Sequence, residues 1–322
     1  MTILGEGSFR YEVRHGFGNL PDGIGWTEVA GVGVDSADRV YAFARGPHRI
    51  VVMDREGNFL DTWGEGIFTN AHGIHIGPDD SVWLTDSGDH SVRRFSRDGK
   101  LLMTIGVPGE TPGHMSGKPF CRCTHTALSP RGDVYVSDGY GNACVHKYDP
   151  AGRHLKSWGK PGILPGEFNL PHNIWCDADG WVYVADRENH RIQVFDGEGR
   201  FETMWHGIHR PTALAMLPNA PCPCCVVSEG GPDMPINRDT PNLGPRLSVV
   251  GLDGKVIARL GTEMAGHEPG RFIAPHGVGV DSAGAIYVAE VAHIAWPSLM
   301  PGPRPDRVAS LHKLEPLAVR AG

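Results

Sequence analysis

The sequence predicts an all-β fold, a six-bladed β-propeller in one domain over residues 1–322, on three observations. First, 44 glycines and 26 prolines are spread along all 322 residues, which suits a repetitive β-protein with many tight turns. Second, apolar residues alternate with a period of two, and no 3.6-residue pattern of useful length occurs. Third, one pattern recurs six times at spacings of roughly 40 to 65 residues, within reach of the period of propeller blades.

Each copy of the repeat begins with an apolar alternation that often ends in Asp. A short turn with Gly or Asp follows, and then a second strand of the type Val-Tyr-Val-x-Asp. The predicted second strands lie at residues 40–43, 82–86, 134–138, 182–186, 225–229 and 286–290. The recurring Asp86, Asp138 and Asp186 are interpreted as residues that cap turns rather than as catalytic acids.

Several copies continue with a third and a fourth alternating run. The third run is seen at residues 50–54, and fourth runs ending near Trp are seen at 59–63, 155–158 and 201–205. Four short strands per repeat are typical of a propeller blade. The sixth copy ends after its third run, at 308–313, and a surplus strand lies at 9–15. We therefore expect the N-terminal strand to complete the sixth blade and close the ring, which removes an exposed sheet edge.

Composition excludes several classes of partner. The net charge is −7 and no segment concentrates Lys and Arg, so neither nucleic acid nor an anionic membrane is expected as a partner. No apolar run approaches the roughly 18 residues of a membrane span, and the N-terminus lacks the pattern of a secretory signal. Seven cysteines, an odd number, indicate reduced thiols and a cytoplasmic location. The oligomeric state is left open.

Histidine opens only alternate copies of the repeat, as His72, His172 and His276, which lie 100 and 104 residues apart. Alternate blades of a six-membered ring are related by about 120°, so three imidazoles can converge on the axis. Three His with an open fourth position is the arrangement of a catalytic zinc. The alternative is that His merely suits this turn in a chain with 17 histidines.

Three further residues follow second strands and are expected on the same face of the propeller as the histidines. Tyr140 beside a divalent cation can have its pKa lowered enough to act as a base, so it is a candidate catalytic residue. Arg45 is a candidate for catalysis and for binding a substrate carboxylate, since guanidinium offers two parallel donors. Arg187 is a second candidate for substrate binding, although Asp186–His190 also resembles a common turn of such repeats.

Two inserts and one cysteine cluster have several interpretations. The inserts 230–246 and 291–307 open on the same face and could be lids over a substrate, blade decoration or an oligomer contact. The cluster Cys222-Pro223-Cys224-Cys225 has no second Cys or His pair at zinc-finger spacing, so we interpret it as structural thiols.

Several motifs carry a resemblance to a known family. They are Ser137-Asp138-Gly139-Tyr140, Phe168 to His172 and Ala185 to Asn189. In this order they resemble NHL-repeat propellers and, more narrowly, the peptidyl-α-hydroxyglycine α-amidating lyases. The resemblance implies zinc held by His72, His172 and His276, a catalytic Tyr140, and active-site arginines at Arg45 and Arg187.

The sequence also departs from that family. Gly277 stands where the lyases have an Asp that helps bind a structural calcium, which makes calcium doubtful here. Gly141 stands where the lyases have a Cys after the catalytic Tyr, so that disulfide cannot form.

The predicted function is therefore a zinc-dependent lyase that cleaves a small, hydroxyglycine-like α-hydroxy carboxylate. One alternative is a zinc-dependent hydrolase or hydratase of a small molecule, in which the metal activates water. Another is a non-catalytic NHL-repeat scaffold that binds other macromolecules.

Overall fold

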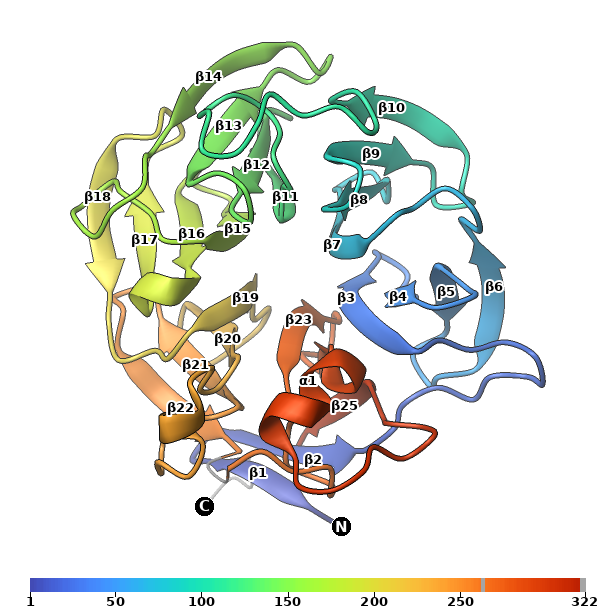
Figure 1. The fold of residues 1–322 in the computed structure, drawn as a ribbon. Coiled ribbons are helices and arrows are strands. Elements are labelled where there is room, and N and C mark those ends of the chain that lie inside the picture. Colours follow the sequence, from blue (N-terminus) through green and yellow to red (C-terminus); the bar gives the residue numbers. More distant parts are fainter. Residues whose placement is uncertain (262–263, 319–322) are drawn as a thin grey trace. The chain divides into compact units, whose positions relative to one another are not determined.

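The computed structural model describes residues 1–261 and 264–318 (Figure 1). Within them, 25 strands form six antiparallel sheets. This confirms the predicted fold class, an all-β six-bladed β-propeller. The prediction of a single domain 1–322 includes residues 262–263 and 319–322, which lie outside the described residues.

Five sheets each contain four strands that follow one another in the chain and in the sheet. Hairpin connections between neighbouring strands explain the many turn glycines. The strands of these sheets are, in order, β3 (Glu28–Val34), β4 (Val40–Arg45), β5 (Ile50–Met53) and β6 (Phe59–Trp63); β7 (Ala71–Ile76), β8 (Val82–Asp86), β9 (Ser91–Phe95) and β10 (Leu101–Ile105); β11 (His125–Leu128), β12 (Val134–Asp138), β13 (Cys144–Tyr148) and β14 (His154–Trp158); β15 (Pro171–Cys176), β16 (Val182–Asp186), β17 (Arg191–Phe195) and β18 (Phe201–Trp205); and β19 (Pro211–Met216), β20 (Cys224–Glu229), β21 (Arg246–Gly251) and β22 (Val256–Leu260).

The sixth sheet joins the two ends of the chain. Its order is β1 (Ile3–Glu6), β2 (Phe9–Arg14), β25 (Leu311–Pro316), β24 (Ile286–Glu290) and β23 (Pro275–Val280). Strand β2 pairs with β25, with Tyr11 opposite Pro316 and Arg14 opposite Lys313. The N-terminal strand thus completes this blade as predicted. The additional fifth strand, β1, was not predicted, because four residues are too few to show an alternation.

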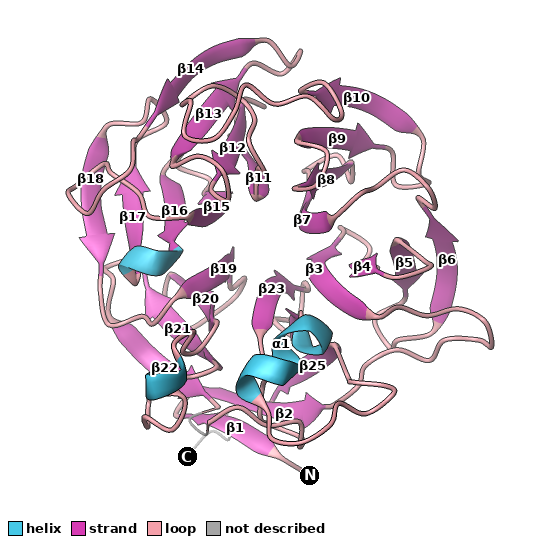
Figure 2. Cartoon of the chain, in the orientation of Figure 1, coloured by secondary structure: helices cyan, strands magenta, loops and turns pink. Residues whose placement is uncertain are grey.

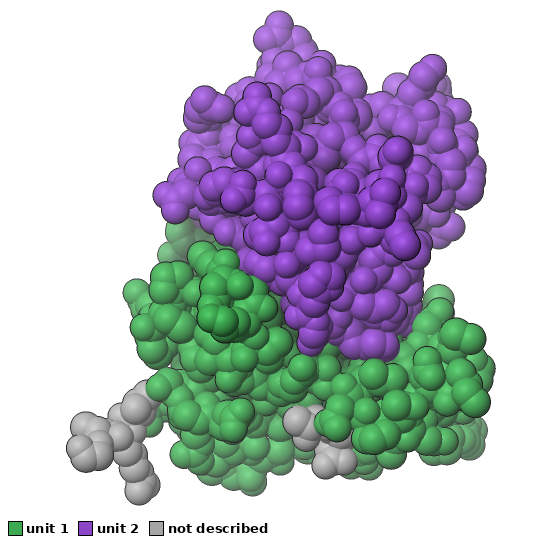
Figure 3. Space-filling model, turned by 90° about the vertical axis from the view of Figure 1, so that its left-hand side faces the viewer, with its two compact units in different colours: residues 1–62, 214–322 green, residues 63–213 purple. Residues whose placement is uncertain are grey.

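The chain divides into two compact units, coloured separately in Figure 3. We call residues 63–213 the central unit and residues 1–62 with 214–322 the terminal unit. The central unit contains the sheets β7–β10, β11–β14 and β15–β18. It also holds the last residue of β6 and the first three residues of β19. The other strands belong to the terminal unit.

A buried tyrosine explains the Val-Tyr-Val pattern of the second strands. Tyr41, on β4, and Tyr287, on β24, are 0% exposed. The Tyr41 hydroxyl donates to Asp35 Oδ2 at 3.0 Å, and the Tyr287 hydroxyl donates to Asp281 Oδ2 at 3.2 Å. The same aspartates accept backbone N–H groups of their own turns, for example from Ala37 at 2.9 Å. The Asp that ends the first strand therefore fixes the turn and satisfies the buried phenol.

The insert 291–307 contains a helix that the sequence pattern did not indicate. Helix α1 (Ala292–Leu299) lies there, and two short 3₁₀ helices occur, η1 (Arg187–Asn189) and η2 (Pro235–Asn237) (Figure 2). Helix α1 is eight residues long and contains Pro297, so its apolar periodicity is too short to detect. In the described part of the chain, no helix is both long enough and apolar enough to cross a membrane.

Two histidines on first strands of the central unit have low pKa values. Burial, and then the charge of His125, lowers the pKa of His75 to about 3. Burial also lowers the pKa of His125 to about 4. A hydrogen bond between its Nε2 and the Ile74 carbonyl, at 3.0 Å, opposes this effect and raises the pKa by less than burial lowers it. Both side chains are therefore neutral in the folded protein at pH 5 to 7.

This difference predicts a dependence of stability on pH. Below about pH 6.5, the unfolded chain protonates both histidines, whereas the folded chain stays neutral down to about pH 4. Their contribution to the free energy of unfolding is full above pH 6.5, decreases as the pH falls below that value, and is gone once the pH has fallen through the folded pKa values of about 4 and 3. Urea unfolding at pH 7 and pH 4.5 should show a smaller loss for the double variant His75→Gln/His125→Gln than for the unsubstituted chain. An equal loss in both proteins would contradict this assignment.

Candidate metal and substrate site

Three buried histidines occupy the same structural position in their sheets. His72, His172 and His276 are the second residues of β7, β15 and β23, with exposures of 2%, 1% and 8%. In each case the pairing with the next strand shifts register at the histidine, for example between Ala71 and Gly73. Such a bulge leaves one residue unpaired and redirects its side chain. His72 and His172 belong to the central unit, and His276 belongs to the terminal unit.

The same backbone contact orients each imidazole. Each Nδ1 lies within hydrogen-bond distance of the carbonyl oxygen of the residue that opens the next copy of the repeat. The pairs are His72 with Thr124 at 2.6 Å, His172 with Thr212 at 2.7 Å and His276 with Ala30 at 2.7 Å. Because a carbonyl only accepts, Nδ1 carries the proton and Nε2 presents its lone pair. Histidines that bind metals are oriented by this kind of contact.

Tyr140 meets two of these histidines in the central unit. Its hydroxyl lies 3.1 Å from His72 Nε2 and 3.0 Å from His172 Nε2. The two imidazole rings are 4.8 Å apart between centroids. The Tyr140 hydroxyl has one proton to share between the two Nε2 lone pairs, so three acceptor atoms lie close together. A divalent cation suits this group of acceptors, and imidazole nitrogens are common zinc ligands, so the residues fit the predicted metal.

Two arginines flank the Tyr140 ring. The guanidinium carbons of Arg122 and Arg187 lie 5.2 and 5.6 Å from the ring centroid. Arg187 Nη1 also donates to the Tyr140 hydroxyl at 3.5 Å, and the Tyr140 N–H donates to the Arg122 carbonyl at 3.3 Å. Arg122 was not predicted from the sequence, although it stands two residues before Thr124 as Arg210 stands two residues before Thr212, and both have positive φ angles, 59° and 47°.

Arg187 is part of a partly buried charge network at η1. It donates to Glu188 at 2.7 Å, and Arg210 also pairs with Glu188 at 2.9 Å. Burial opposes the charge of Arg187, but Tyr140 and Glu188 outweigh it and raise the pKa of Arg187. Burial likewise opposes ionisation of Glu188, and its hydrogen bond with Arg210 and the charge of Arg187 lower the pKa of Glu188. The turn residue Arg187 is thus also a contact of Tyr140.

Arg45 ends β4 in the terminal unit and has a carboxylate partner. Its Nη1 donates to Glu28 Oε1 at 2.9 Å, and Glu28 is only 3% exposed. Glu28 Oε2 also accepts the N–H of Ile294, in α1, at 3.0 Å. Glu28 therefore connects Arg45 to the insert 291–307. The sequence pattern did not predict that Glu28 would pair with Arg45 or contact the insert.

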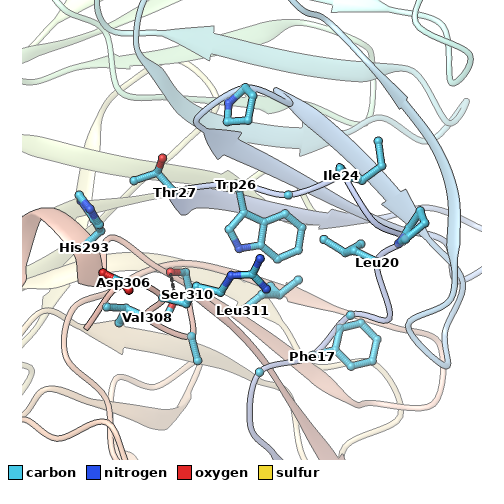
Figure 4. A pocket seen from close by; sticks show the side chains of 18 of the residues that line it. Phe17, Leu20, Ile24, Trp26, Thr27, His293, Asp306, Val308, Ser310 and Leu311 are labelled. Carbon is cyan, nitrogen blue, oxygen red and sulfur yellow. Dashed lines mark hydrogen bonds between the residues drawn. The ribbon is translucent and has the colours of Figure 1, made fainter. Parts of the chain in front are cut away.

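A cavity of about 780 Å³ lies within the terminal unit (Figure 4). Trp26, Leu20 and Ile24 give it an apolar wall, and the insert 291–307 contributes His293 and Asp306. The cavity residue Thr27 donates its N–H to the Arg45 carbonyl at 2.7 Å. The insert therefore forms part of a cavity wall.

The acidic residues that end the second strands cap turns, as predicted. They accept backbone N–H groups from the loops that lead into the histidines. Asp86 accepts from Thr69 and Asn70 at 2.6 and 2.9 Å, Asp186 from Asn169 at 2.7 Å, and Glu290 from Ile273 and Ala274, both at 2.7 Å. These carboxylates hold the chain just before His72, His172 and His276.

All seven cysteines are free thiols. A Cβ added at Gly141 would lie 2.3 Å from Cys121 Sγ, so the thiol occupies the space of a side chain that is missing here. Cys224 and Cys225 are buried and Cys222 is exposed, consistent with structural thiols.

Comparisons with known proteins place the chain in a family. An NHL repeat model matches residues 168–195. Human NHL repeat-containing protein 3 is 30% identical over 277 residues, which cover 81% of this chain and 76% of that protein. The chain belongs to the NHL-repeat family. Mouse NHL repeat-containing protein 3 is 29% identical over 293 residues, covering 84% of this NHL-repeat chain and 80% of the mouse protein.

Enzymes are also among the relatives of this NHL-repeat protein. Peptidyl-alpha-hydroxyglycine alpha-amidating lyase 1 of Drosophila melanogaster is 31% identical over 272 residues, which cover 77% of this chain and 48% of the fly protein. The chain therefore spans about half the length of that lyase. Among solved structures, streptogramin B lyase superposes with a TM-score of 0.61 at 12% identity, covering 95% of this chain and 97% of the lyase. At that identity, the likeness shows the fold alone.

Proposed function

We propose that this NHL-repeat protein is a zinc-dependent lyase that cleaves a small, hydroxyglycine-like α-hydroxy carboxylate. The observation that carries the proposal is the Tyr140 hydroxyl, 3.1 and 3.0 Å from the Nε2 atoms of His72 and His172 and within 3.5 Å of Arg187. This arrangement combines candidate metal ligands with a candidate base. The lyase among the relatives supports the same chemistry.

In this proposal His72, His172 and His276 hold zinc. All three share the bulge position and the Nδ1 contact with a backbone carbonyl. Bound zinc would lower the pKa of the substrate hydroxyl. Gly277, which follows His276, offers no side-chain ligand, so a structural calcium forms no part of the proposal.

Tyr140 acts as the base in the proposed reaction. In the proposed step the phenolate form of Tyr140, with Arg187 and Arg122 beside its ring, accepts the proton of the substrate hydroxyl. The electron pair of the O–H bond becomes the second bond of a carbonyl group, and the adjacent C–N bond breaks. Its electron pair leaves with the nitrogen, which takes up a proton and becomes an amide. The other product is an α-carbonyl acid, glyoxylate for a hydroxyglycine.

The two arginines have separate tasks in this proposal. Arg187 contacts Tyr140 and keeps the phenolate paired. Arg45 binds the substrate carboxylate with its guanidinium fork, and Glu28 holds that fork in position.

Product analysis tests the proposal. The zinc-loaded protein should convert an N-acyl-α-hydroxyglycine into equimolar amide and glyoxylate. A chelator should stop the reaction and added zinc should restore it. Failure of zinc-loaded protein to release glyoxylate would overturn the lyase assignment, and hydrolysis of the acyl group instead would favour the hydrolase.

The Arg45→Lys variant is expected to raise KM by about 10- to 100-fold with a smaller change in kcat, because lysine cannot offer the two parallel donors of arginine. Arg39→Lys is the matched control, since Arg39 is another ion-paired arginine near β4, with Asp35 at 2.6 Å. Steady-state kinetics of both variants provide the measurement. Equal KM values for the two variants would exclude Arg45 from carboxylate binding.

A further inference from the structure

Most buried acids that end a second strand have a cationic partner on the third strand of the same sheet. A buried carboxylate requires such compensation, because removing its charge from water is costly. In these sheets an arginine supplies it: Arg191 pairs with Asp186 at 2.8 Å, Arg246 with Glu229 at 2.9 Å, and Arg93 reaches Asp86 at 4.0 Å.

The sheet β11–β14 of the central unit breaks this pattern. Asp138 ends β12 and is 0% exposed, yet among the described residues no arginine or lysine pairs with it. Strand β13 carries Cys144 directly opposite Asp138, and His146 two residues further on. These two residues occupy the places of Arg191 and Gln193 on β17. The sheet has therefore exchanged an arginine for two side chains that bind metals.

The donor atoms of the three side chains lie at distances that suit a small cation. His146 Nε2 is 3.2 Å from Asp138 Oδ2 and 3.5 Å from Cys144 Sγ, and all three atoms lie within 4.8 Å of one another. His146 and Cys144 are 0% and 2% exposed. Tetrahedral zinc with bonds of about 2.0 to 2.3 Å separates its ligand atoms by roughly 3.3 to 3.8 Å. The group is thus close to the size of three corners of a zinc site.

Neighbouring groups hold two of the three ligands. His146 Nδ1 lies 2.6 Å from Ser157 Oγ, directly across the β13–β14 pair. Asp138 accepts from Cys121 N–H at 2.9 Å and from Asn142 Nδ2 at 2.7 Å. Such contacts orient ligands around metals.

We propose that Asp138, Cys144 and His146 form a second metal site, which binds zinc or a similar thiophilic divalent cation and replaces the missing arginine. One carboxylate and one thiolate would neutralise a divalent ion, and sulfur, nitrogen and oxygen ligands together suit zinc. The site is independent of the proposed catalytic zinc. It would stabilise the turn from Asp138 to Tyr140, and its role is structural.

Cobalt substitution tests the proposal, because this is the only one of the two proposed metal sites that includes a cysteine. Protein that has been stripped with a chelator and loaded with Co²⁺ should show a thiolate-to-cobalt charge-transfer band in the near ultraviolet and bind two metal ions per chain. Cys144→Ser should lose the band and one ion. The matched control Cys176→Ser, another buried cysteine, should keep both.

The test separates this site from the lyase proposal. His72→Ala should lose lyase activity and retain the band. A second measurement needs no variant: alkylation of Cys144 in the unsubstituted protein should be slower with zinc than after chelation. Absence of the band in the cobalt-loaded unsubstituted protein, or its persistence in Cys144→Ser, would overturn the proposal.

Discussion

Replacement of Tyr140 by phenylalanine is expected to lower kcat by roughly 10²- to 10⁴-fold, the usual contribution of a positioned general base. The variant removes only the hydroxyl that lies 3.1 and 3.0 Å from the two histidines. The histidines and their backbone contacts remain, so the zinc content should not change. The measurement is turnover of the N-acyl-α-hydroxyglycine together with metal analysis of the same sample.

Tyr148→Phe is the matched control for this variant. Tyr148 lies in the same sheet, on β13, and is 4% exposed. Its replacement should leave kcat within a few-fold of the unsubstituted protein. Unchanged turnover in Tyr140→Phe would refute the role of Tyr140 as base and would shift the proposed chemistry to another group.

Replacement of His172 by alanine is expected to weaken zinc binding by more than about 100-fold, because loss of a group that merely orients a ligand already costs 10- to 100-fold. Lyase activity should fall with the bound zinc. The affinity is best measured in the Cys144→Ser background, so that the second proposed site does not contribute. His114→Ala, at an exposed histidine, is the control. Equal zinc affinity in the two variants would exclude His172 as a ligand.

These two variants also separate an enzyme from an NHL-repeat scaffold. A scaffold that only binds macromolecules has no need for stoichiometric zinc or for a tyrosine hydroxyl between two imidazoles. Human and mouse NHL repeat-containing protein 3 show that the family extends beyond proteins named as lyases. Loss of metal and loss of turnover should therefore be correlated in His172→Ala if the chain is an enzyme.

The repeat made most of the fold predictable. Each copy has its own hairpin chemistry, such as Tyr41 bonded to Asp35, so a local pattern determines a local structure. The period of the repeat also predicted that the three histidines would have equivalent positions, and each of them lies at the same bulge, in β7, β15 or β23. Where the contacts of a residue come from its own sheet, the sequence was sufficient to predict its position.

Features that depend on contacts between segments far apart in sequence were not predictable. Glu28 is 266 residues from Ile294 and still accepts its N–H. Arg122 lies 5.2 Å from the centroid of the Tyr140 ring, a contact between two loops that no alternation of apolar residues indicates. Helix α1 was not expected because Pro297 interrupts it and eight residues show too little periodicity. Strand β1 exists only because β2 offers it an edge.

Diffraction on both sides of the zinc absorption edge tests the central claim most directly. For crystals of the zinc-loaded protein, the account predicts an anomalous peak about 2.0 to 2.1 Å from the Nε2 atoms of His72, His172 and His276. No peak beside these histidines, or a peak from which one of the three nitrogens points away, would contradict it.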